Sequence, residues 1–151
     1  MATWVTGRLQ LCGIERVTHE NERLYPPHNP DSQPYWEGLK ERRLMLQRCA
    51  DCGKVRHYPR PVCSACHSME SDWFEASRRG TLHSWSVSRH AFHPSFKPDL
   101  PMTFVTVDLD EGVRLLGIYK GAGEPDIGAA VVIRFEDVRG ADFTLPVIHP
   151  A

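Results

Sequence analysis

The chain has 151 residues, a formal net charge of −1, and 41% hydrophobic and 25% charged side chains. This composition is that of an ordinary water-soluble protein with one compact unit or two small ones. Runs of about 18 apolar residues are missing, which excludes a transmembrane helix. Residues 1–8 show no basic patch followed by an apolar core, so no signal peptide is predicted. A cytoplasmic location is therefore expected.

The first segment, residues 1–33, is predicted to be an N-terminal arm. Residues 3–11 alternate weakly in hydrophobicity, which fits an edge strand or a disordered lead-in. Residues 18–34 are polar and contain four prolines, so they favour an extended stretch without its own core. Cys12 lies outside any cysteine motif and is predicted to be a small buried hydrophobe.

A short helix is predicted over residues 34–42. Cap-type residues precede a proline at Pro34, which suits the first turn of a helix. Tyr35, Trp36 and Leu39 recur at helical spacing and give the helix one apolar side.

Two C-x-x-C pairs follow the helix, and they are the strongest functional signal in the chain. Cys49 and Cys52 form the first pair, and Cys63 and Cys66 form the second. Two such turns supply the four thiolates of a tetrahedral zinc site, and four protein ligands leave no open position for catalysis. Disulfides would need an oxidising compartment, a redox motif needs only one pair, and an iron–sulfur cluster fits this even spacing less well.

The segment 34–78 is predicted to be a helix followed by a zinc ribbon of the rubredoxin-like type. Strands are expected over residues 44–48, 55–58 and 73–75, with the two cysteine turns, or knuckles, between them. Gly53 suits the first knuckle because a positive φ costs glycine little. His67 takes that place in the second knuckle, which is therefore expected to be less regular. Such a small unit depends on the metal for much of its stability.

The segment 79–151 is predicted to be a five-stranded barrel. Strand signals recur with turn residues between them over 81–90, 102–109, 113–119, 129–135 and 142–148. Five short strands fit an OB-type barrel, in which closure removes the sheet edges, although other small barrels fit the pattern as well. The fold class is therefore mainly β.

The loop between the first two barrel strands is the longest. It contains Arg89, Phe92, Phe96 and Lys97 among several prolines and histidines. Long irregular loops often carry function, but the two phenylalanines can equally pack on the barrel. If a coenzyme A is bound, Arg89 and Lys97 are the candidates for its phosphates. Phe92 or Phe96 would then contact the pantetheine arm or a partner protein.

An ordered set of segments carries a resemblance to a known family, namely residues 35–39, 46–53, 58–66 and 77–84, and 127–128 before 131–133. Over roughly residues 34–148 the chain resembles a family of acyl-CoA-associated proteins that was formerly catalogued as a domain of unknown function. The resemblance implies a helix, a zinc ribbon and an OB-fold in one accessory subunit. It also implies that a partner, either a thiolase-like aldolase or acyltransferase or a hot-dog-fold hydratase, supplies catalysis on a shared acyl-CoA. Steroid and other lipid breakdown are among the pathways that the resemblance implies.

Catalysis by this chain alone is not expected. His57, His83, His90 and His93 can do acid–base chemistry, but none has a recognisable partner in the sequence. A stand-alone zinc enzyme is disfavoured by the closed ligand set.

A nucleic-acid-binding module is the alternative function, because ribbons and OB-folds both bind nucleic acid. Residues 40–97 hold eleven Lys and Arg against five acids, whereas residues 98–151 hold four against nine. The predicted barrel is thus acidic, and the chain's isoelectric point of about 6.7 lies well below the range of clearly basic domains. The accessory-subunit prediction is therefore preferred.

Overall fold

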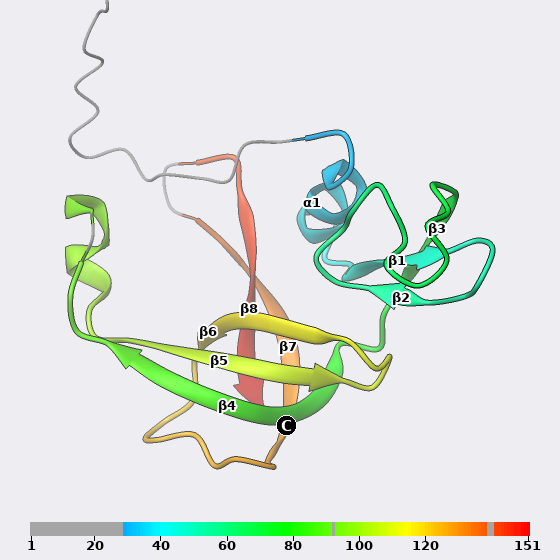
Figure 1. Cartoon of the computed structure of the whole chain (residues 1–151). Helices are drawn as coiled ribbons and strands as arrows, with labels where there is room; N and C mark the ends of the chain where they lie inside the picture. Colours follow the sequence, from blue (N-terminus) through cyan, green and yellow to red (C-terminus); the bar gives the residue numbers. More distant parts are fainter. Residues whose placement is uncertain (1–28, 92, 139–140) are drawn as a thin grey trace, which may run out of the picture.

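The computed structural model describes residues 29–91, 93–138 and 141–151, and shows a short helix, a small sheet and a closed barrel (Figure 1). The arm predicted over residues 1–33, including Cys12, lies almost wholly outside the described residues. Within them, no helix is long and apolar enough to cross a membrane.

The helix α1 spans Gln33–Lys40 and begins one residue before the predicted start at Pro34. Ser32 occupies the N-cap position, but its hydroxyl donates to Asn29 Oδ1 at 2.8 Å instead of accepting from the helix. The helix ends two residues earlier than predicted, because Arg42 adopts a φ of 63° and the Arg43 N–H turns back to the Gly38 carbonyl.

The ribbon sheet has the strand order β2-β1-β3 and is antiparallel throughout. Strand β1 is Met45–Cys49, β2 is Val55–Arg56 and β3 is Ser71–Glu75. Strand β2 has only two residues instead of the predicted four, because the chain turns away after Arg56 and the Arg60 N–H donates to the side chain of Gln47. The predicted plan of knuckle, hairpin, knuckle and strand is otherwise confirmed.

The barrel closes in the order β4-β5-β6-β8-β7. Its strands are β4 (Arg79–Ser88), β5 (Met102–Leu109), β6 (Arg114–Tyr119), β7 (Ala130–Asp137) and β8 (Thr144–Pro150). Strands β6 and β8 pair in parallel and β4 pairs with β7, so the sheet has no open edge. Inward-facing aliphatic residues fill the interior, namely Leu82, Val105, Val107, Leu115, Ile133 and Ile148.

Helix α1 joins the ribbon to the barrel. The rings of Trp36 and Phe143 lie 4.7 Å apart between centroids, which ties the helix to the segment before β8. Lys40 Nζ contacts Asp142 at 2.6 Å, and Arg42 contacts Asp137. The buried residues of helix, ribbon and barrel therefore form one continuous core.

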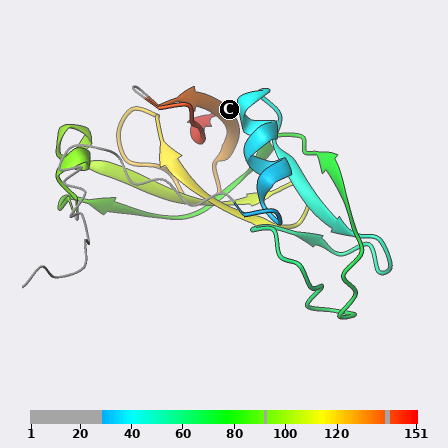
Figure 2. The same ribbon diagram turned by 90° about the horizontal axis from the view of Figure 1, so that it is seen from above.

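The predicted long loop forms the tip of the β4–β5 hairpin. It contains a 3-10 helix, η1 (Pro94–Asp99), that the sequence did not predict. His93 caps it, since its Nδ1 accepts from the Ser95 N–H. The hairpin carries η1 to the end of the molecule opposite the ribbon (Figure 2).

Candidate metal centre

The two knuckles bring the four cysteines together at the end of the ribbon. Cys49 and Cys66 Sγ atoms lie 3.5 Å apart, and those of Cys52 and Cys63 lie 3.6 Å apart. All four Sγ atoms lie within 4.8 Å of one another. These separations suit four ligands around one tetrahedral ion, as the sequence predicts.

Both knuckles have the same backbone geometry. In the first, the Gly53 N–H donates to the Cys49 carbonyl at 3.0 Å, and Gly53 has a φ of 72°. In the second, the His67 N–H donates to the Cys63 carbonyl at 3.0 Å, and His67 has a φ of 60°. The expectation of a less regular second knuckle is therefore wrong. His67 adopts the same left-handed conformation as Gly53, at the energetic cost that a residue with a side chain meets at positive φ.

Backbone N–H groups point at two of the sulfur atoms and favour their thiolate form. The N–H groups of Ala65 and Cys66 lower the pKa of Cys63 to about 6. The N–H of Cys52 lowers the pKa of Cys49 in the same way. The side chains of Cys52 and Cys49 act in the opposite sense on Cys66 and raise its pKa to about 12. Thiolates are the form that binds a metal, so the knuckles prepare Cys49 and Cys63 for it.

The donor set fits a structural zinc ion. Cys49 and Cys63 are buried and Cys52 and Cys66 are exposed, so the centre lies at the edge of the ribbon. Lys54 Nζ donates to Ser64 Oγ at 3.2 Å and bridges the two knuckles next to the thiolates. Zinc held by four thiolates ties the knuckles together and leaves no ligand position for water or substrate.

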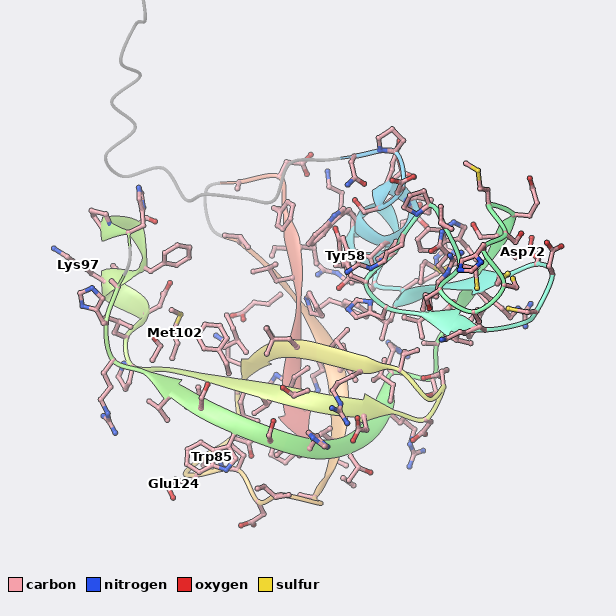
Figure 3. All side chains as sticks on the ribbon, viewed as in Figure 1. Tyr58, Asp72, Trp85, Lys97, Met102 and Glu124 are labelled. Atoms are coloured by element: carbon pink, nitrogen blue, oxygen red, sulfur yellow. The ribbon has the colours of Figure 1, made fainter. Side chains whose placement is uncertain are left out.

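The structure separates the other predicted site residues from the metal centre. Arg89 and Lys97 are exposed on the hairpin tip, and Phe96 is partly buried with its ring 6.4 Å from that of His93. Phe92 lies outside the described residues. Figure 3 places Lys97 and Asp72, a ribbon residue on β3, at opposite ends of the molecule. The metal centre and the hairpin tip are therefore separate sites in the chain.

The histidines occupy different environments. His57 is largely enclosed, and this burial lowers its pKa to about 4. His83 lies on the outside of the barrel, where its Nδ1 contacts Asp108 at 2.9 Å and Arg114 bonds the same carboxylate at 2.7 Å. This cluster has no signal in the sequence, because the pairing of β4, β5 and β6 creates it.

Two family descriptions match the chain. Residues 36–70 match "ChsH2, rubredoxin-like zinc ribbon domain", and residues 73–136 match "ChsH2, C-terminal OB-fold domain". The second match assigns the closed barrel to the OB-fold among the small barrels that the sequence left open.

Curated relatives and a solved structure agree with these matches. The chain is 39% identical over 132 residues to a probable enoyl-CoA hydratase alpha subunit of Thermomonospora curvata, covering 85% of this chain and 40% of the relative. It is 30% identical over 127 residues to the 3-oxo-4,17-pregnadiene-20-carboxyl-CoA hydratase alpha subunit of Mycobacterium tuberculosis, covering 84% and 40%. The chain thus spans about 40% of the length of these two relatives.

The solved structure is described as "Ltp2-ChsH2(DUF35) aldolase". One of its chains superposes with a TM-score of 0.75 at 37% identity, covering 83% of this chain and 98% of that one. Four cysteines placed to bind a metal, a ribbon joined by a helix to an OB-fold barrel, and these matches together show that the chain belongs to the ChsH2 family of zinc-ribbon and OB-fold proteins.

Proposed function

We propose that this chain is a non-catalytic accessory subunit of an acyl-CoA-processing enzyme. In this proposal it binds a thiolase-like aldolase or acyltransferase, or a hydratase subunit, and helps to hold the acyl-CoA. The observation that carries the proposal is the near-complete match to one chain of the Ltp2-ChsH2(DUF35) aldolase. The closed thiolate set supports it, because such zinc stabilises a scaffold and does not activate water.

The steroid part of the proposal rests on one relative's name. The Mycobacterium tuberculosis protein is named for a pregnadiene carboxyl-CoA substrate, which favours a steroid or related lipid acyl-CoA here. A cytoplasmic location belongs to the same proposal, since reduced thiolates suit that compartment.

The hairpin tip is proposed to meet the coenzyme A or the partner. Arg89 and Lys97 are both exposed there and can pair with phosphates, while the ring of Phe96 can contact the pantetheine. Phe92 belongs to the same proposal on the strength of the sequence alone, because it lies outside the described residues. We also propose that the chain divides into two domains after the N-terminal arm: residues 34–78 form the helix and ribbon, and residues 79–151 form the barrel.

A tagged copy purified from its native host tests the subunit proposal. Stoichiometric recovery of a thiolase-like or hydratase-like protein is expected, with zinc near one equivalent in the same sample. Recovery of the chain alone, or with nucleic acid only, would contradict it.

The role of the hairpin tip is tested on the recovered complex. Arg89→Glu with Lys97→Glu should raise the KM for acyl-CoA, or release the partner. Arg79→Glu is the matched control, because this exposed arginine lies at the other end of β4. An equal effect of both changes would refute the assignment of the tip.

A further inference from the structure

Arg56, the last residue of β2, has a buried charge with no partner among the described residues. Its side chain is only 7% exposed. Its three guanidinium nitrogens, Nε, Nη1 and Nη2, are each buried and have no hydrogen-bond partner within the described part of the chain. Arginine does not lose its proton in proteins, so the group cannot escape the cost of burial by becoming neutral. An unpaired buried charge is strongly destabilising.

The polar residue opposite Arg56 does not pair with that charge. Gln47 lies directly opposite Arg56 in the β1–β2 pair, so both side chains lie on one face of the sheet. The amide of Gln47 bonds other groups: its Nε2 donates to Ser71 Oγ at 3.0 Å, and its Oε1 accepts from the Arg60 N–H at 3.0 Å. Among the described residues, no carboxylate forms an ion pair with Arg56.

The segment 57–60 runs across this face and is held at two points. One is the hydrogen bond of Arg60 to Gln47. The other is the bond from Trp36 Nε1 to the Tyr58 hydroxyl, at 2.8 Å. Tyr58 is 40% exposed, so the segment lies at the surface, and Figure 3 shows it beside the ribbon. Because Arg60 bonds the side chain of Gln47, the segment reaches over the face that also carries Arg56, and its movement would break these two bonds.

We propose that the Arg56 guanidinium is the recognition group of an oxyanion site in the ribbon, which takes a carboxylate or phosphoryl group when segment 57–60 moves aside. The planar guanidinium presents paired N–H donors that match the two oxygens of such a group. This site lies on the ribbon, away from the hairpin tip proposed to meet coenzyme A, and it does not depend on that proposal.

The test uses the zinc-loaded full chain and inorganic phosphate or acetate as probes. Its melting temperature is measured as each anion replaces chloride at constant ionic strength. A rise of about 5–10 °C is expected at a hundredfold excess over Kd, and it should grow with the logarithm of the anion concentration. The two probes separate a phosphoryl ligand from a carboxylate ligand. In chloride, Arg56→Met should melt at or above the wild-type temperature, because an apolar chain replaces an unpaired charge. In phosphate and acetate it should show no such rise.

Arg60→Met is the matched control. It removes the same charge from an exposed side chain in the adjoining segment, and its backbone N–H still bonds Gln47. It should keep the full response to the anion. The Nε–Hε signal of Arg56 in ¹⁵N NMR of the wild type should also shift as the anion is added and level off as the site fills, which decides the question if Arg56→Met fails to fold. No rise in melting temperature and no shift of this signal in the wild type, or an equal rise in Arg56→Met, would overturn the proposal.

Discussion

At the scale of single residues, the buried thiolates decide whether the ribbon exists. Cys63 is fully buried, and two N–H groups lower its pKa. Cys63→Ser should therefore abolish stoichiometric zinc binding and unfold the ribbon, because in such small units the free energy of metal binding supplies the free energy of folding. Zinc measured by atomic emission and far-UV circular dichroism check this. Ser64→Ala, an exposed change one residue away, should keep both signals. Full zinc in Cys63→Ser would contradict the ligand assignment.

The acid sensitivity of the fold should depend on His57. Burial lowers its pKa from 6.5 to about 4, so the unfolded chain takes up a proton on this group before the folded one does. The free energy of unfolding should therefore fall as pH drops from about 6.5 to 4, by about 3 kcal/mol from this residue. Above pH 6.5 the group is neutral in both states and contributes nothing to the pH dependence.

Urea unfolding of wild type and His57→Phe across this range measures the effect. Both proteins carry the same thiolates, so protonation of the zinc ligands is common to the two curves. Between pH 6.5 and 4, the free energy of unfolding of the wild type should fall by about 3 kcal/mol more than that of His57→Phe. If the two free energies fall in parallel with pH, His57 is not enclosed as described.

At this scale the sequence predicts the metal ligands well, because their spacing is local. The positive φ of Gly53 is confirmed, whereas the same conformation at His67 is not predicted, because residues other than glycine adopt it uncommonly. The unpaired state of Arg56 has no sequence signal, because a basic residue in a strand is usually exposed.

At the scale of the elements, close approach of β4 and β5 depends on Gly80. A Cβ at Gly80 would lie 2.4 Å from the Asp108 carbonyl oxygen and 2.8 Å from a Val107 methyl. Backbone cannot yield as a side chain does, so Gly80→Ala should cost about 3 kcal/mol or more. Gly117→Ala is the matched control: its Cβ would meet mainly the flexible end of Ile148 at 2.9 Å, and its cost should be smaller. Thermal unfolding compares the two, and a larger loss for Gly117→Ala would contradict this account.

The elements also show where local pattern stops being informative. All five barrel strands were predicted within a few residues, because each carries its own alternation and turn signals. The parallel pairing of β6 with β8 is not predicted from the sequence, because it joins Ile118 to Val147, which are far apart along the chain. The 3-10 helix η1 was missed for a different reason: its six residues contain two prolines and have no amphipathic period.

At the scale of the whole molecule, the sequence predicts the parts but not their junction. The contacts of α1 with the segment before β8 join residues about a hundred positions apart, such as Lys40 and Asp142. From the sequence alone, Trp36 is predicted only to lie on the apolar side of the helix. In the structure it contacts both the ribbon, through Tyr58, and the barrel, through Phe143.

This junction predicts which contacts hold ribbon and barrel in one cooperative unit. Trp36 is only 8% exposed, so Trp36→Ala should cost about 3–5 kcal/mol and uncouple the ribbon from the barrel. Lys40→Met removes an ion pair whose two side chains are 39% and 93% exposed, and it should change stability little because water screens such pairs.

The measurement is urea unfolding followed by zinc release and by far-UV circular dichroism. In the wild type and Lys40→Met, both probes should report one transition. In Trp36→Ala, zinc should leave at a lower urea concentration than the barrel unfolds, because the ribbon has lost its buried attachment while the barrel keeps its own aliphatic core. Coincident transitions in Trp36→Ala, or equal destabilisation by Lys40→Met, would show instead that the surface ion pairs couple the two halves.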